Sequence, residues 1–67
     1  MTTTTYTVTG MTCGHCVASV REEVAGISGV VQVDVALDSG AVEITSDREL
    51  DRSEVEAAVA EAGYALA

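Results

Sequence analysis

Two closely spaced cysteines give this sequence its clearest chemical signal. Residues 10–16 read GMTCGHC, and Cys13 and Cys16 are the only two cysteines in the 67-residue chain. Two thiolates at this spacing can converge on one soft metal ion when the first lies on a loop and the second in the first turn of a helix. Unpaired N–H groups and the positive end of the helix dipole stabilise negative sulfur at such a turn. Thiolates favour Cu(I) and Zn(II).

The number of donors indicates what kind of metal site this is. A closed structural zinc site takes about four ligands, whereas the sequence offers Cys13, Cys16 and its single histidine, His15. Two sulfurs without other obvious donors suit a metal ion that needs few ligands. Because no group looks arranged for catalysis, we expect a metal carrier and not an enzyme.

Composition limits the partners and the cellular location expected for this protein. Eleven acidic residues stand against three arginines, for a net charge of −8, which would repel nucleic acid and anionic membranes. We expect one domain over 1–67, with no direct membrane insertion, because no apolar run approaches the roughly 20 residues of a membrane span. The first five residues lack a secretion signal. A cytoplasmic location is therefore expected, where a cysteine pair is more often metal-binding or redox-active than a structural disulfide.

Hydrophobic periodicity predicts the elements on either side of the cysteines. Residues 5–9 alternate as in a half-buried strand, and Gly10 ends it. A helix over about 14–25 follows, with an apolar stripe made of Cys16, Val17, Val20 and Val24. The cysteine pair is thus expected at a strand-to-helix junction.

The second half of the chain repeats this alternation of strand and helix. Residues 30–45 predict a hairpin with its turn at 38–40, and its first strand alternates through Val31, Val33, Val35 and Leu37. A second helix is expected to begin at Asp51 and Glu54, which form a variant of the capping box, or at the alternative pair Ser53 and Glu56. Its apolar stripe is Val55, Ala58, Val59 and Ala62. Gly63 should end this helix, and residues 64–67 could form a short last strand.

The resulting order is βαββαβ in under 70 residues. It predicts an α+β, ferredoxin-like sandwich in which a four-stranded antiparallel sheet carries two helices on one face. The first strand-to-helix loop would then lie exposed at one edge of the domain, with the cysteines accessible to a partner.

The motif and its distance to Gly63-Tyr64 closely resemble the heavy-metal-associated domain family, in particular its small bacterial copper chaperones, over nearly the whole chain. The resemblance implies that Cys13 and Cys16 bind Cu(I). It also implies transfer of Cu(I) by ligand exchange to the metal-binding domain of a copper-transporting P-type ATPase. Met11 would then be a buried anchor of the loop, and Tyr64 would pack beside the site.

Three residues near the cysteines have two interpretations each. His15 is either an exposed residue between the ligands or a group that tunes the thiols or supplies a third ligand when two molecules share copper. Met11 is interpreted as packing, with thioether ligation as the alternative. Tyr64 is interpreted as core packing, with shielding of the metal loop from water as the alternative.

The charged residues around the site depart from the family pattern, and this affects the partners that we expect. Several chaperones of this family carry lysines around the site, whereas this chain has only Arg21 there. Docking would rely on apolar contact around the loop and on the shared metal, or on a partner with a basic patch. A copper-responsive repressor is a further candidate partner, and excess Cu(I) is expected to produce a copper-bridged homodimer.

The residues leave other functions open. The chain could carry mercury, zinc or cadmium, or it could be a metal-binding domain from a P-type ATPase. A thiol-disulfide oxidoreductase is the alternative from another class, because Cys-x-x-Cys with a histidine before the second cysteine is also a redox pattern. The βαββαβ order and the absence of any proline, which excludes a cis-proline, argue against a thioredoxin-type enzyme.

Overall fold

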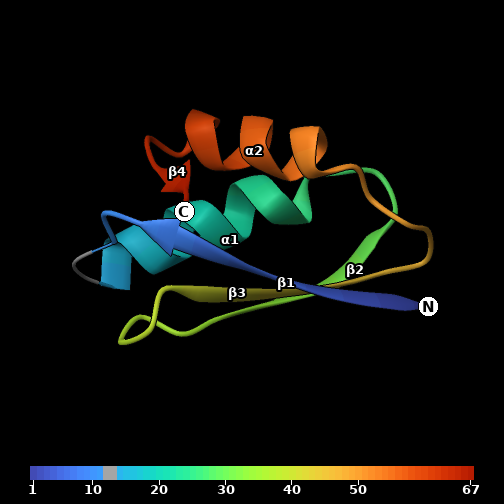
Figure 1. Cartoon of the computed structure of the whole chain (residues 1–67), viewed down its shortest axis with the longest axis horizontal. Helices are drawn as coiled ribbons and strands as arrows, with labels where there is room; N and C mark the ends of the chain where they lie inside the picture. Colours follow the sequence, from blue (N-terminus) through green and yellow to red (C-terminus); the bar gives the residue numbers. More distant parts are fainter. Residues whose placement is uncertain (12–13) are drawn as a thin grey trace.

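A computed structural model describes residues 1–11 and 14–67. The elements follow the order β1 (Thr2–Thr9), α1 (Gly14–Ala25), β2 (Val30–Val35), β3 (Ala41–Ser46), α2 (Arg52–Glu61) and β4 (Ala65–Leu66). The strands form one antiparallel sheet in the order β2-β3-β1-β4, and both helices cover the same face of it (Figure 1). The predicted ferredoxin-like arrangement is confirmed.

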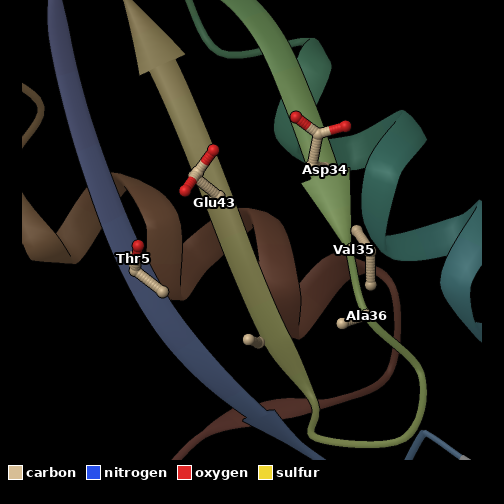
Figure 2. A pocket seen from close by; sticks show the side chains of 6 residues that line it. Thr5, Asp34, Val35, Ala36 and Glu43 are labelled. Atoms are coloured by element: carbon tan, nitrogen blue, oxygen red, sulfur yellow. The ribbon is translucent and has the colours of Figure 1, made fainter.

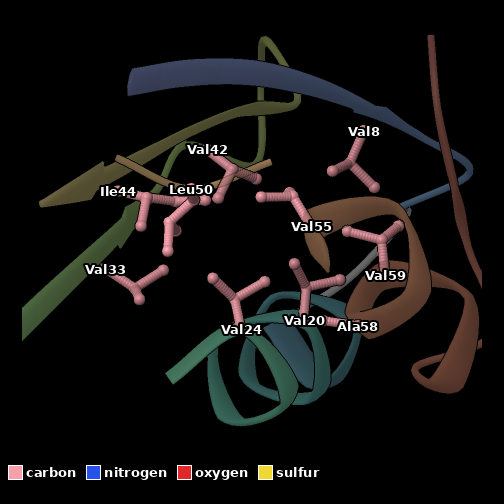
Figure 3. Packing of buried hydrophobic residues seen from close by; sticks show 10 residues of the cluster. All are labelled: Val8, Val20, Val24, Val33, Val42, Ile44, Leu50, Val55, Ala58 and Val59. Atoms are coloured by element: carbon pink, nitrogen blue, oxygen red, sulfur yellow. The ribbon is translucent and has the colours of Figure 1, made fainter. Parts of the chain in front are cut away.

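The core lies between the helices and the covered face of the sheet. Side chains from α1, α2, β1, β2 and β3, with one residue from the loop before α2, meet there (Figure 3). The core cluster consists of Val8, Val20, Val24, Val33, Val42, Ile44, Leu50, Val55, Ala58 and Val59. The predicted stripes turn inward at Val20 and Val24 of α1 and at Val55, Ala58 and Val59 of α2. Val17, also assigned to the first stripe, is only half-buried and lies outside the cluster.

The first strand is longer than predicted. The expected strand began at residue 5, whereas β1 begins at Thr2 and pairs with β3 from Thr2↔Ser46 to Thr7↔Ala41. Consecutive threonines show no alternation of polar and apolar residues, so hydrophobic periodicity alone does not predict a strand there. Because threonine is β-branched and favours strands, the run extends the ladder once β3 is alongside.

Two apolar residues of the predicted hairpin leave the expected pattern. Val31 is 56% exposed because the register between β2 and β3 shifts between Val30 and Gln32, so the alternation is interrupted there. Leu37 is 41% exposed because β2 already ends at Val35. The hairpin itself is confirmed.

The ends of α2 show how local sequence sets its bounds. At its start the Glu54 carboxylate accepts a hydrogen bond from the Asp51 N–H at 3.0 Å, as the first predicted capping pair requires. At its end Gly63 has φ +92°, and the N–H groups of Gly63 and Tyr64 donate to the carbonyls of Ala60 and Val59. These two bonds form a Schellman motif, which turns the chain toward β4.

Candidate metal-binding site

The end of the sheet where β1 runs into α1 holds the predicted site. Gly10 follows β1 with φ +90°, a conformation that side chains other than glycine rarely adopt. Of the two predicted ligands, Cys13 lies outside the described residues, and Cys16 is the third residue of α1. The structure therefore places one predicted ligand in the first turn of a helix.

Cys16 is held more firmly than the sequence suggested. Its side chain is only 9% exposed, and it lies on the same helical stripe as Val20 and Val24, which are fully buried. The expectation that both cysteines would be openly accessible is wrong for Cys16. Val20 and Val24 lie one and two turns after Cys16 and are packed in the core. The start of α1, with Cys16, is therefore also held against the core.

The start of α1 presents unpaired backbone N–H groups and the positive end of the helix dipole. α1 has twelve residues, and its first turn contains no acidic residue. The N–H groups of that turn and the helix dipole therefore act on Cys16 without competition from a nearby carboxylate of the same turn. This environment suits a soft, negatively charged sulfur ligand.

The remaining predicted site residues separate into two kinds. His15 is exposed, next to the exposed Gly14 at the start of α1. Met11 and Tyr64 are both half-buried and pack against the core cluster. Their packing agrees with the first interpretation of each residue, as an anchor and as a core side chain.

Tyr64 also contacts the start of the loop. A Cβ atom added to Gly10 would lie 3.4 Å from Cδ1 of the Tyr64 ring, so the ring lies against the backbone of Gly10. The backbone of Tyr64 is fixed by the Schellman motif at the end of α2, in which its N–H donates to the Val59 carbonyl. The sequence identified Gly10 only as a strand breaker. Local patterns could not predict this contact, because 53 residues lie between the two positions.

A third segment reaches the same end of the molecule. The Val8 N–H donates to the Gly40 carbonyl at 2.8 Å, so the β2–β3 turn lies beside the end of β1. This turn presents the exposed side chains of Leu37 and Asp38. Sequence reasoning had assigned Leu37 to a strand face and therefore missed it as a surface residue near the site.

Within the described residues, no group of three or more His, Cys, Asp or Glu side chains could hold a metal ion. A hollow on the outer face of the sheet is lined by Thr5, Asp34, Val35, Ala36, Ala41 and Glu43 (Figure 2). None of the predicted site residues lines it. The start of α1 is therefore the candidate site that the described part of the chain supports.

Comparisons with known proteins agree with this fold and this motif. The model of the heavy-metal-associated domain family matches residues 5–65. Copper chaperone CopZ of Staphylococcus aureus is 36% identical over 58 residues, which cover 85% of each chain. The chain therefore belongs to the heavy-metal-associated domain family.

Two solved structures share the whole architecture. A CopZ metallochaperone superposes with a TM-score of 0.90 at 31% identity, covering 98% of this chain and 100% of its own. A copper-binding domain from HMA7, a P-type ATPase, superposes with a TM-score of 0.90 at 26% identity, covering 100% and 92%. The same fold thus occurs in a free chaperone and in a transporter domain.

Neither of the two described helices is long and apolar enough to cross a membrane.

Proposed function

We propose that this chain is a copper chaperone that binds Cu(I) through the thiolates of Cys13 and Cys16. The observation that carries the proposal is the position of Cys16, the last residue of the motif at residues 10–16, in the first turn of α1. Two soft sulfurs at a helix start suit Cu(I), which accepts few ligands. The copper ion is cargo, and the protein has no catalytic role.

The burial of Cys16 and the small number of ligands both bear on transfer. Cys16 is buried at the start of α1, against the core. An ion with two sulfur ligands has open positions, so an incoming thiolate can bind before an outgoing one leaves. We propose that the receiving thiolates belong to the metal-binding domain of a copper-transporting P-type ATPase. The likeness to the domain from HMA7 supports a partner of this kind.

Charge around the site sets the kind of surface that a partner should have. Asp38 in the β2–β3 turn and Glu61 at the end of α2 are exposed, and the exposed cation nearest the motif in sequence is Arg21. The partner surface should therefore be neutral or basic, with apolar contact at Met11 and Leu37. A copper-responsive repressor is a second candidate recipient, and a cytoplasmic location remains part of the proposal.

The test is an anaerobic titration of the reduced protein with Cu(I) against a chromogenic chelator, with Zn(II) in parallel. Cys16→Ser should abolish tight Cu(I) binding, and Ala18→Ser, on an exposed position of the same helix, should leave it unchanged. Because Cys16 is buried, Cys16→Ala provides a second variant that adds no buried hydroxyl, and thermal unfolding checks that each variant folds.

The outcomes separate the alternatives. Tight Cu(I) binding that is lost in both Cys16 variants supports the proposal. Binding of Zn(II) with failure of Cu(I) to compete would assign the site to another soft metal. If neither metal binds, the cysteine pair must be interpreted as redox chemistry.

A further inference from the structure

The face of the sheet opposite the helices is open. Both helices cover the same face (Figure 1), so the residues of β1, β2 and β3 that alternate with the core positions point away from them. The cross-strand register groups these outer residues into three rows. The rows are Thr3, Thr45 and Gln32; Thr5, Glu43 and Asp34; and Thr7 and Ala41, next to Ala36, whose N–H donates to the Ala41 carbonyl.

The middle row carries two carboxylates side by side. Asp34 and Glu43 are register partners on neighbouring strands, both are exposed, and Figure 2 shows both carboxylates standing out from this face. Like charges directly opposite each other destabilise a sheet. Gln32 donates a hydrogen bond to Asp34 at 3.0 Å, but this neutral donor leaves both charges in place. The chain alone therefore keeps an unfavourable charge pair at the centre of its open face.

Among the described residues, no cation pairs with these two carboxylates. β1, β2 and β3 contain neither lysine nor arginine, and the three arginines lie on α1, on α2 and in the loop between β3 and α2. Arg48 pairs with Glu54 at 2.7 Å. Arg52 pairs with Glu56 at 3.6 Å. A counter-charge for the open face has to come from outside the chain.

A hollow beside the two carboxylates adds shape to this charge. It has a volume of about 310 Å³, and the methyl groups of Ala36 and Ala41 give it an apolar part next to Asp34 and Glu43 (Figure 2). An arginine side chain has the matching features. Its methylenes pack on apolar surface, and its planar guanidinium presents several N–H donors to carboxylates.

We propose that the outer face of the sheet docks a partner protein that presents an arginine. Its guanidinium would lie between Asp34 and Glu43, with its methylenes over Ala36 and Ala41. Charge complementarity selects this occupant, because a second copy would bring a further net charge of −8, and nucleic acid or anionic membranes would be repelled. Since α1 lies on the opposite face, this contact and the copper site do not compete for one surface.

The test is an NMR titration of the reduced, metal-free chain with a capped Gly-Arg-Gly peptide. The same peptide with citrulline, which has nearly the shape of arginine without its charge, is the control. Only the arginine peptide should bind, and sodium chloride should weaken the binding by screening. The amide signals that should shift are those of Thr5, Asp34, Ala36, Ala41 and Glu43.

Matched variants separate this site from the general negative charge. Asp34→Asn and Glu43→Gln should each weaken binding by about threefold or more, whereas Glu22→Gln, which removes one charge from the exposed side of α1, should not. Ala36→Leu keeps every charge but fills the hollow, so it should weaken binding as well. Glu43→Gln should also raise the unfolding temperature, because it removes the unfavourable pair with Asp34.

Three outcomes would overturn the proposal. They are the absence of shifts with the arginine peptide, equal shifts with the citrulline peptide, and equal weakening by Glu22→Gln. Circular dichroism checks that each variant folds. Because this surface lies outside the cysteine motif, failure here leaves the copper titration unaffected.

Discussion

Glu54 is the residue whose acid–base behaviour the structure changes most clearly. Its carboxylate accepts two hydrogen bonds from Arg48, at 2.7 and 3.1 Å, and one from the Asp51 N–H. These bonds, with the Arg48 bonds first in importance, lower the pKa of Glu54 from 4.5 to about 2. The Arg48 and Glu54 side chains are 42% and 33% exposed, so solvent screening keeps the net stabilisation small.

This lowered pKa predicts a pH dependence of stability. The charged form of Glu54 is favoured by folding, so its contribution is complete above the pKa of the unfolded chain and is lost as pH falls from about 5 toward 2. Glu54→Gln should lower the unfolding temperature most at neutral pH, and the difference from the parent chain should shrink with acidification. Thermal unfolding followed by circular dichroism across this pH range measures it.

A matched carboxylate gives the control for that prediction. Glu56 also pairs with an arginine, but its distance to Arg52 is 3.6 Å and both side chains are more than half exposed. Glu56→Gln should therefore change the unfolding temperature less at every pH. Equal pH profiles for the two variants would contradict the assignment of the effect to the Arg48–Glu54 contact.

At the scale of elements, two glycines end segments for different reasons. Gly40 in the β2–β3 turn has φ +74°, and a Cβ there would lie 2.6 Å from the Val8 carbonyl oxygen. Gly63 after α2 has φ +92°, but a Cβ there meets nothing within 4 Å. A side chain at position 40 would therefore face both an unfavourable φ and a clash with the backbone of β1, whereas a side chain at position 63 would face only the unfavourable φ.

Alanine at these two positions should separate the two costs. Gly63→Ala should destabilise the protein by about 1–2 kcal/mol, the ordinary penalty of a left-handed conformation. Gly40→Ala should cost clearly more, because β1 must also move away from the turn. Urea unfolding of both variants measures the free energies. Equal losses would mean that the hairpin shifts freely and that the close approach of Gly40 to β1 contributes nothing.

At the scale of the whole molecule, charge imbalance opposes compaction. Eleven acidic residues and three arginines lie on a domain with a radius of gyration of 10.5 Å, and two of the arginines already pair with glutamates. The Debye length falls from about 30 Å at 0.01 M salt to about 3 Å at 1 M. Added salt therefore screens repulsion across the entire molecule.

We expect sodium chloride to raise the unfolding temperature between these limits, because the many repulsive pairs outnumber the two ion pairs. Scanning calorimetry over a salt series measures the effect, and potassium chloride should reproduce it if screening is the cause. A falling unfolding temperature would mean that the ion pairs outweigh the net charge. The same screening should slow association with a basic partner.

The sequence by itself determined the βαββαβ order, the helix bounds near 14–25, the capping pair Asp51 and Glu54, and the helix end at Gly63. These features depend on neighbours a few residues apart, and side-chain periodicity, capping and backbone freedom are local properties. The motif at residues 10–16 is local too, so it identified the candidate ligands and the family. Residue spacing alone was sufficient for all of these.

Only the tertiary structure decided the features that depend on contacts between distant segments. The threonine run became strand through pairing with β3, and Val31 left the alternation at a shift in cross-strand register. Cys16 became buried because Val20 and Val24 on its stripe enter the core, and Tyr64 reached Gly10 through the turn after α2. Burial and pairing belong to the assembled sheet, since each requires a surface that another part of the chain provides.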